Sequence, residues 1–255
     1  MAELPDLTVF AQILNRKFKG EVLKELEITE ARKLNVSAAV LEAALENKKL
    51  AEVSREGKTL KFHFGDQTLG LHLMLRGELV ELESEKPRFQ ILAFHFKNGK
   101  GFAVIDLQKQ AKPTLNPEPS QAPDALSISK AEFSALVAKK RSLIKTLLMD
   151  QKSIRGIGNS YADEILYHAK ISPFSVANTI PEKAATKLFK SLESILNKAI
   201  KDIAEANGDE LKGELKDFMS IHSSKLKTTA KGEPIKTEKI GGRTTYYTDA
   251  QELFD

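Results

Sequence analysis

The chain contains no cysteine, which excludes disulfides, a thiol nucleophile and a metal site built on thiolates. No apolar run comes near the roughly 18 residues that a membrane span needs. The N-terminus, MAELPDLTVF, lacks the basic segment and apolar stretch of a signal peptide. We therefore expect an intracellular protein with no membrane partner.

Charge of one sign is also scarce, because 39 Lys and Arg residues oppose 35 Asp and Glu residues and leave a net charge of +4. That excess is too small to indicate a nucleic-acid partner unless the basic residues cluster. With 255 residues, of which 41% are hydrophobic, the chain can bury one large core or two smaller ones. The composition excludes a disordered chain, a collagen and a coiled-coil rod.

Apolar residues alternate along the first part of the chain, as is typical of half-buried strands. In TLKFHF, the residues Leu60, Phe62 and Phe64 share one face, and TLGLHLML, FQILAFHF and GFAVID are further strand candidates. The exception is the start, where apolar residues recur at helical spacing from Leu7 to Phe18. This part of the chain is therefore predicted to be a β-rich domain that begins with a helix.

The segment KPTLNPEPSQAPD holds four of the nine prolines and predicts an extended, solvated connection. Beyond it, apolar residues at helical spacing predict one helix through 133–148, another through 188–203 and a short one through 211–218. A basic segment follows, and Gly-Gly before RTTYYT predicts a β-hairpin. We expect an α+β protein with a β-rich domain at 1–111, a linker at 112–126, a helical domain at 127–222 and a hairpin at 223–255.

Two predicted helical segments flank the sequence RGIGN at residues 155–159. Gly156 and Gly158 allow a tight turn whose N–H groups, with the positive end of the next helix, can approach an anion closely. Asn159 stands where an N-cap is expected. From spacing alone, an ordinary corner between two helices is the favoured interpretation and a turn that grips DNA phosphate is the alternative.

Four blocks of the sequence lie in the order found in one family. GIGNSYADEILYHAKISP resembles the helix–two-turns–helix signature of the formamidopyrimidine-DNA glycosylase/endonuclease VIII family. MAELPDL resembles the family's opening, EGKTLKFHFGDQTLGLHLMLRGEL its lysine-bearing hairpin, and GEPIKTEKIGGRTTYYTDAQ its C-terminal finger. The resemblance implies an N-terminal β-sandwich with an N-terminal helix, followed by a helical domain and a hairpin finger.

The resemblance also implies a chemistry. After removal of Met1, the free amine of Ala2 would attack the sugar C1′ of a damaged nucleotide, displace the base and form a Schiff base, with Glu3 shuttling protons. Lys58 and Arg243 would grip the phosphate beside the lesion and assist elimination, which cuts the strand. The expected protein is a DNA glycosylase and abasic-site lyase that works as a monomer without a cofactor, in the cytoplasm at the nucleoid.

Further positions match family residues that contact DNA: His72, Leu75, Lys140, Lys145, Asn159 and Arg243. Leu75 would be an apolar wedge, and Asn159 and Arg243 would bind phosphate. For His72, a half-buried, hydrogen-bonded strand histidine is almost as good an interpretation. For Lys140 and Lys145, a solvated helix face is the alternative.

The chain departs from the family in three places. Ala2 replaces the usual proline, so the nucleophile is a primary amine whose imine must be protonated. The finger has Ile235, Thr248 and Gln251 at cysteine positions, so no zinc site is expected. In the usual DPRRFG loop, Gln108 and Gln110 occupy the arginine and phenylalanine positions, which predicts weak filling of the gap left by an extruded base and a preference for abasic or partly single-stranded DNA.

Two other functions stay open on the sequence. A catalytically inactive protein could keep the phosphate contacts and bind damaged or structured DNA, and Ala2 is the feature that separates it from the enzyme. A protein unrelated to DNA, such as a ribosomal component that shares the helical corner, would leave the N-terminal block unexplained.

Overall fold

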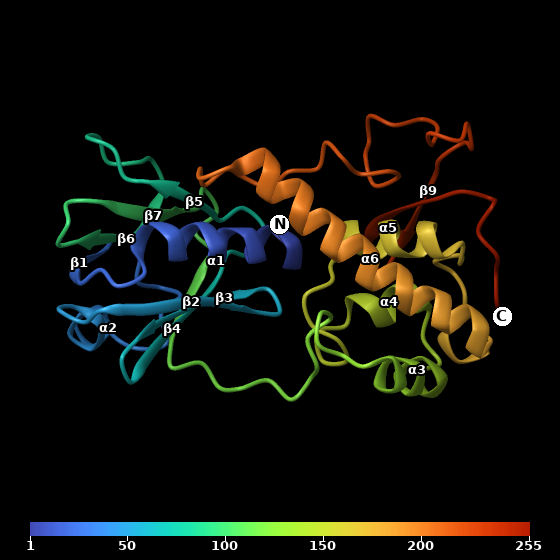
Figure 1. Cartoon of the computed structure of the whole chain (residues 1–255), viewed down its shortest axis with the longest axis horizontal. Helices are drawn as coiled ribbons and strands as arrows, with labels where there is room; N and C mark the ends of the chain where they lie inside the picture. The colour runs from blue at the N-terminus through green and yellow to red at the C-terminus, as the bar shows by residue number, and fades with distance from the viewer. The chain divides into compact units, whose positions relative to one another are not determined.

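The computed structural model describes all 255 residues, which form two compact units. The first, here called the β-rich unit, contains Met1–Pro119 and Ile203–Leu215, and the second, the helical unit, contains Ser120–Asp202 and Lys216–Asp255 (Figure 1). No helix is long and apolar enough to cross a membrane. The predicted α+β class is confirmed, with the strands concentrated in the first unit.

Two four-stranded antiparallel sheets build the β-rich unit, with strand orders β1-β6-β7-β5 and β2-β3-β4-β8. The strands span β1 Leu23–Ile28, β2 Leu50–Glu56, β3 Thr59–Phe64, β4 Gln67–His72, β5 Glu78–Glu81, β6 Gln90–Phe96, β7 Gly101–Ile105 and β8 Lys112–Leu115. In β3, buried and half-buried residues alternate as the sequence predicts.

Aromatic rings join the two sheets. Phe62 of β3 stacks with Phe94 of β6 at 5.3 Å between ring centroids, and Phe94 stacks with Phe102 of β7 at 4.4 Å. Helix α1 (Leu4–Phe18) lies along the sandwich (Figure 1) and contributes Phe18, whose ring stacks on Phe96 at 4.9 Å. The N-terminus of the chain is thereby tied to the centre of the core.

The short helix α2 (Ala38–Leu45) is not predicted by the sequence pattern. It begins at Ser37, whose side chain accepts a hydrogen bond from the N–H of Val40, and it buries only Leu41 and Leu45. So few buried residues produce a weak periodic signal.

The linker expected from residue 112 is wrong at its start, because Lys112–Leu115 form the edge strand β8. An edge position tolerates Pro113, since no neighbour needs its missing N–H. Both backbone groups of Leu115 bond to the side chain of Asn35, at 2.8 and 2.9 Å. These contacts with distant residues give no local pattern in the sequence.

The helical unit contains α3 Lys130–Lys139, α4 Ile144–Met149, α5 Asn159–Ala169, a 3₁₀ turn at Ala177–Thr179, and most of α6 Glu182–Asn207. The expectation of one helix through 133–148 is wrong, because the helix is interrupted from Lys140 to Leu143. There Leu143 pairs with Val176, and the N–H of Ile144 donates to the carbonyl of Ser175 at 2.8 Å. This backbone pairing overrides the helical periodicity.

The helix expected through 211–218 is also absent. Helix α6 ends before Gly208, which has a φ of 58°, and the chain after it is irregular. Leu211 packs against the core of the β-rich unit, and the N–H of Leu215 bonds to Asp6. The apolar residues of this segment therefore serve tertiary contacts rather than one helix face.

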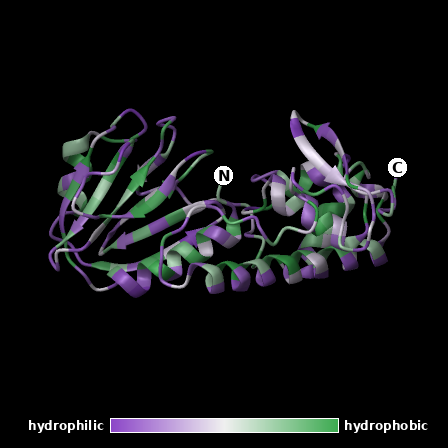
Figure 2. Ribbon diagram, turned by 90° about the horizontal axis from the view of Figure 1, so that it is seen from above, coloured by the Kyte–Doolittle hydropathy of each residue, from purple (hydrophilic) through white to green (hydrophobic).

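The predicted hairpin is confirmed as β9 (Lys236–Ile240) and β10 (Arg243–Tyr247), which pair antiparallel across Gly241 and Gly242. Figure 2 shows this hairpin in purple and near-white, with little of the green of hydrophobic residues, whereas the strands of the sandwich carry hydrophobic residues interspersed with hydrophilic ones. Four of the five residues of β9 are exposed. The hairpin is a surface element of the helical unit.

Candidate active site

A reciprocal capping box fixes the first residues of the chain. The N–H of Glu3 donates to Oδ2 of Asp6 at 3.0 Å, and the carboxylate of Glu3 accepts the N–H of Asp6. Pro5 lies in the first turn of α1, where its missing N–H costs no helical hydrogen bond. Ala2 and Glu3 are held just before the helix and are both buried.

The N-terminal amine faces a second carboxylate. The α-amino group of Met1 lies 2.9 Å from Oε2 of Glu214, in the segment after α6. A cavity of about 280 Å³ adjoins this pair and is lined by Met1, Ala2, Leu75, Glu78, Lys212 and Glu214, among others. It is slightly smaller than a drug-sized ligand site and has room for one small group beside the amine.

Asp6 carries the strongest electrostatic perturbation near this cavity. Burial raises the pKa of Asp6 to about 7, with the negative charges of Glu214 and Glu3 adding to the effect, while the N–H groups of Glu3 and Leu215 oppose it. Near neutral pH, Asp6 is therefore divided between its charged and uncharged forms. Three carboxyl groups surround the chain's first residues, and the sequence pattern identified only that of Glu3.

Lys58 lies in the tight turn between β2 and β3 and is largely buried, with 9% exposure. Gly57 permits this turn with a φ of 58°. Arg55 fixes the turn to α1, because its guanidinium donates to the carbonyl of Gly57 at 3.0 Å and to Oγ1 of Thr8 at 2.9 Å. The same unit thus positions Lys58 together with Ala2 and Glu3.

His72, at the end of β4, is close enough to Lys58 to respond to its charge. Burial lowers the pKa of His72, and the positive charges of Lys58 and Lys112 lower it further. Nδ1 of His72 accepts the N–H of Met74 at 3.0 Å, which places the proton of the neutral ring on Nε2. His72 therefore acts here as a neutral ring that shapes the following loop.

That loop presents Leu75. The N–H of Gly77 donates to the carbonyl of Leu73 at 2.9 Å, and a Cβ at position 77 would lie 2.3 Å from that oxygen, so the turn requires glycine. Leu75 is 59% exposed at the tip and also lines the cavity beside Ala2. The position is suited to the apolar wedge that the sequence predicts.

In the helical unit, the side chain of Gln151 organises the RGIGN turn. Its amide donates to the carbonyls of Met149 and Ile157 at 2.9 and 2.8 Å, and it accepts the N–H of Gly156 at 2.9 Å. The predicted N-cap is displaced by one residue, because Gly158 is the N-cap and Asn159 is the first helical residue. Asn159 instead donates to the carbonyl of Thr244 at 2.9 Å and so anchors the hairpin to α5.

Lys145 lies neither on a solvated helix face nor on a surface open to DNA, the two positions that the sequence allowed. Its ammonium is fully buried, 2.7 Å from Oδ1 of Asp163 and 2.7 Å from Oγ1 of Thr245. Oδ2 of Asp163 also bonds to Nδ1 of His222 and to the N–H of Tyr246, at 2.7 and 3.0 Å. An ammonium enclosed in this way cannot contact a phosphate, so the expected DNA contact is corrected to a structural one.

Glu164, the next residue of α5, fixes another segment of the same unit. Its carboxylate accepts three backbone N–H groups, from Ser220, Ile221 and His222, at 2.8–3.0 Å. Neither Asp163 nor Glu164 was singled out from the sequence, since acidic residues on a helix usually face solvent. Their burial against residues more than fifty positions away has no local signal.

Two of the predicted cationic contacts are accessible. Arg243 is exposed at the start of β10, and the side chain of Lys140 is 42% exposed beside α3, 4.0 Å from Asp150. Lys140 and Arg243 lie in the helical unit with Asn159, whereas Ala2, Glu3, Lys58, His72 and Leu75 lie in the β-rich unit.

Hydrogen bonds and ring contacts surround Thr248 and Gln251, two of the positions at which the family resemblance places cysteines. The N–H of Thr248 donates to Oε1 of Gln251 at 2.9 Å, and the amide of Gln251 donates to the carbonyl of Ile171 at 2.8 Å. Tyr247 packs edge-on against Phe174 at 5.1 Å between centroids. The structure contains no group of three or more His, Asp or Glu side chains that could hold a metal ion.

A β-sandwich with an N-terminal helix, followed by a helix–two-turns–helix domain with a surface hairpin, defines a class of DNA-binding repair proteins. Two family models match this chain: the N-terminal domain of formamidopyrimidine-DNA glycosylase over residues 1–112 and its H2TH domain over residues 115–208. The chain belongs to the formamidopyrimidine-DNA glycosylase/endonuclease VIII family.

Whole-chain relatives agree. Formamidopyrimidine-DNA glycosylases of Pelotomaculum thermopropionicum and Lactobacillus gasseri are each 27% identical, covering 97% and 100% of both chains, respectively. The fold is similar to a solved Lactococcus lactis enzyme of this name in complex with DNA that contains an abasic site. That structure has a TM-score of 0.87 and 25% identity, over 98% of this chain and 100% of that one.

Proposed function

We propose that this protein is a DNA glycosylase and abasic-site lyase whose nucleophile is the α-amine of Ala2, exposed by removal of Met1. The observation that carries the proposal is the environment of the chain's start. Glu3 is fixed by the capping box, and Ala2 lines a cavity in which the amine of Met1 meets the carboxylate of Glu214. This is a site in which an amine is held and its protons can be moved.

The chemistry proceeds in steps that the nearby groups can serve. The neutral amine of Ala2 attacks C1′ of the damaged nucleotide, and the C1′–N bond to the base breaks as the base takes up a proton. The attached amine then gives up one proton, and the sugar ring opens as O4′ is protonated, which leaves a protonated Schiff base between Ala2 and C1′. Glu3 is the proposed proton shuttle, since it is buried next to Ala2. Lys58 is proposed to bind the phosphate beside the lesion and assist elimination. Arg243 of the helical unit is proposed to contribute a phosphate contact of its own.

Binding to DNA is proposed to rest on phosphate contacts from Asn159, Arg243 and Lys140, with His72 shaping the loop that presents Leu75. The DNA-bound relatives among the solved structures support this role. Lys145 is left out of the proposed contact set because it is buried. We place the protein at the nucleoid of the cytoplasm, where its substrate would be.

Borohydride trapping on a duplex with one abasic site tests the proposal. The wild-type protein is expected to form a covalent complex through Ala2, which peptide mapping after digestion of the DNA identifies. Ala2→Glu is the control, because a large second residue prevents removal of Met1 and keeps the nitrogen of residue 2 in a peptide bond. A protein that binds this DNA but gives no trapped complex would be the inactive binder instead.

A further inference from the structure

Three loops meet at one end of the sheet β1-β6-β7-β5. Ile105, the last residue of β7, pairs with Glu78 at the start of β5 and with Gln90 at the start of β6. The register therefore brings together the loop before β5 (residues 73–77), the loop before β6 (residues 82–89) and the loop after β7 (residues 106–111). We call this set the edge loops, and all of them belong to the β-rich unit.

The edge loops expose several large apolar side chains. Eight large hydrophobic side chains are exposed in the chain, and four of them lie in these loops: Met74, Leu75, Phe89 and Leu107. Their exposures run from 36% to 65%. Isolated exposed apolar residues are common on protein surfaces, but a cluster of them indicates a contact surface.

Each edge loop also holds one non-glycine residue in the left-handed region, namely Met74 at φ 57°, Phe89 at φ 61° and Lys109 at φ 54°. That conformation is unfavourable for a bulky side chain, and such strain persists where the surroundings enforce it and is concentrated at functional sites. For Phe89 the enforcing contact is visible. Its carbonyl accepts the N–H of Asp106 at 2.9 Å.

Asp106 in turn holds the loop after β7. It is buried, and its carboxylate accepts the N–H groups of Gln108, Gln110 and Ala111 at 2.7–2.8 Å. The backbone that supports Phe89 is therefore rigid, although the ring itself is 44% exposed. A ring held out from a rigid support is already in position to stack on a partner.

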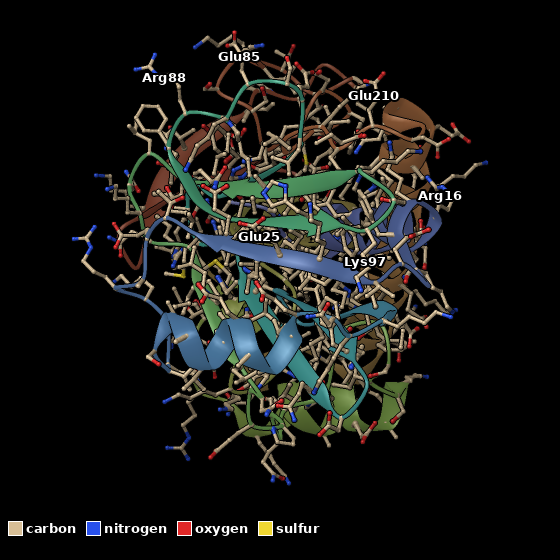
Figure 3. The ribbon with its side chains drawn as sticks, turned by 90° about the vertical axis from the view of Figure 1, so that its left-hand side faces the viewer. Arg16, Glu25, Glu85, Arg88, Lys97 and Glu210 are labelled. Carbon is tan, nitrogen blue, oxygen red and sulfur yellow. The ribbon has the colours of Figure 1, made fainter.

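Arg88 gives this ring a cationic neighbour. Its guanidinium lies 5.1 Å from the centroid of Phe89, within cation–π distance, and it forms no ion pair. Figure 3 shows Arg88 projecting away from the ribbon at the periphery of the unit. An exposed aromatic ring beside an unpaired cation suits a partner that combines flat bases with phosphate charge.

We propose that Phe89, supported by Arg88, is a wedge that stacks in the base pairs of duplex DNA next to the damaged nucleotide. The inference rests on the proposed function. The edge loops are continuous with the candidate active site, because Leu75 belongs to both. Phe89 supplies the aromatic ring and Arg88 the guanidinium that Gln108 and Gln110 lack. The gap left in the duplex by the extruded nucleotide would therefore be filled from the loop before β6 and not from the loop after β7.

A fluorescence experiment reads this contact without any reaction. The chain has no tryptophan, so Phe89→Trp introduces a single reporter. On a duplex that carries a tetrahydrofuran analogue of an abasic site, stacking against a base should quench its emission about twofold or more. Val40→Trp is the matched control, because Val40 is exposed at 51% on α2, outside the edge loops, and its reporter should not change.

The spectra can also overturn the proposal. If the emission of the Phe89→Trp variant responds to bound DNA no more than that of the Val40→Trp variant, Phe89 stays outside the duplex. Quenching of the Phe89→Trp variant that grows with protein concentration in the absence of DNA would instead identify the edge loops as a contact between copies of this chain. Either result excludes the wedge.

A second variant separates the wedge from a structural role. Phe89→Gly relieves the left-handed strain, so its melting temperature should equal or exceed that of the wild type. In single-turnover trapping, it should process an abasic site in duplex at least about tenfold more slowly, with less than about a twofold change on single-stranded DNA, which has no stack to fill. Phe89→Tyr should retain the duplex rate.

The outcomes distinguish this inference from the proposed function. If the wild type traps abasic DNA and Phe89→Gly acts on duplex as fast as the wild type, the wedge is wrong and the enzyme stands. If the wild type traps nothing, the proposed function fails. In that case, quenching of the Phe89→Trp variant on the abasic duplex would support insertion of residue 89 by a protein that binds DNA without reacting. An absence of quenching would refute that insertion.

Discussion

The α-amino group of Met1 and the carboxylate of Glu214 lie 2.9 Å apart, although 213 positions separate them in the sequence. The contact is formed by the segment Ile203–Leu215, which folds with the β-rich unit. Glu214 therefore marks the place where the chain's first amine is held. After loss of Met1, the amine of Ala2 becomes the first one, and Ala2 lines the same cavity.

We expect the mature protein to begin at Ala2, because a small second residue permits removal of the initiator methionine. Intact mass measured on untagged protein gives the answer directly. If an active protein retains Met1, the amine of Ala2 is not the nucleophile.

Glu214→Gln should shift the pH profile of borohydride trapping to lower pH, because a carboxylate beside the amine of Ala2 would favour its protonated form. Unlike a proline iminium, the Schiff base of Ala2 retains an N–H that can be lost, so both limbs of the profile should move. The charged groups around the amine are Glu3, Asp6, Arg76, Glu78, Lys212 and Glu214.

Ala2→Pro supplies the control for this shift. A proline iminium has no N–H to lose, so in that background Glu214→Gln should move only the acid limb, which reports the free amine. Profiles that respond to Glu214→Gln identically in both backgrounds would mean that Glu214 does not stabilise the protonated Schiff base.

Asp6 should make stability fall as pH rises. Its pKa is about 7 in the folded protein and near 3.8 in the unfolded chain, so the folded state binds the proton more tightly. The resulting stabilisation is complete below about pH 4 and is lost as pH rises through 7, with an upper bound of about 4 kcal/mol at 1.4 kcal/mol per unit.

Asp6→Asn removes this titration. The free energy of unfolding, measured by denaturant at pH 5 and at pH 8 in wild type and variant, tests it. The wild type should lose stability relative to Asp6→Asn between these values. A difference between the two proteins that does not vary with pH would show that Asp6 is ionised throughout.

Lys145→Met should destabilise the helical unit by about 3–5 kcal/mol, because it leaves the buried carboxylate of Asp163 without its cation. Lys140→Met is the matched control, since the side chain of Lys140 is 42% exposed and its loss should cost less than about 0.5 kcal/mol. Denaturant unfolding measures both. If Lys145→Met weakened DNA binding with no loss of stability, a direct phosphate contact would be restored to consideration.

Prediction from the sequence succeeded where the signal is local. Three elements have such a signal within a few residues: the alternation of buried residues in β3, the helical spacing of apolar residues in α1 and the Gly-Gly turn of the β9–β10 hairpin. The prediction of one helix through 133–148 failed at residues 140–143, because backbone pairing with Ser175 and Val176 overrides the helical periodicity there.

The candidate site follows the same division. Ala2 and Glu3 belong to one contiguous block whose resemblance could be seen directly. The contact of Met1 with Glu214 and the burial of Lys145 against Thr245 join residues a hundred or more positions apart, so no local pattern announces them.

Arg243→Ala should weaken binding to DNA of any sequence and reduce the slope of log affinity against log salt by about one unit, because a phosphate contact carries affinity without sequence information. The hairpin that presents Arg243 is anchored through Thr244 to Asn159. Asn159→Ala should therefore weaken binding as well, but with little change in slope, since the amide is neutral.

A salt titration on an abasic duplex, followed by fluorescence anisotropy, measures both effects. Lys130→Ala is the matched control, because Lys130 is an exposed cation at the start of α3 that is not assigned to DNA, and its slope should equal that of the wild type. Equal slopes for Arg243→Ala and the wild type would remove Arg243 from the phosphate contacts. If Lys130→Ala reduced the slope as much as Arg243→Ala does, the helical unit would bind DNA through diffuse charge rather than through the hairpin.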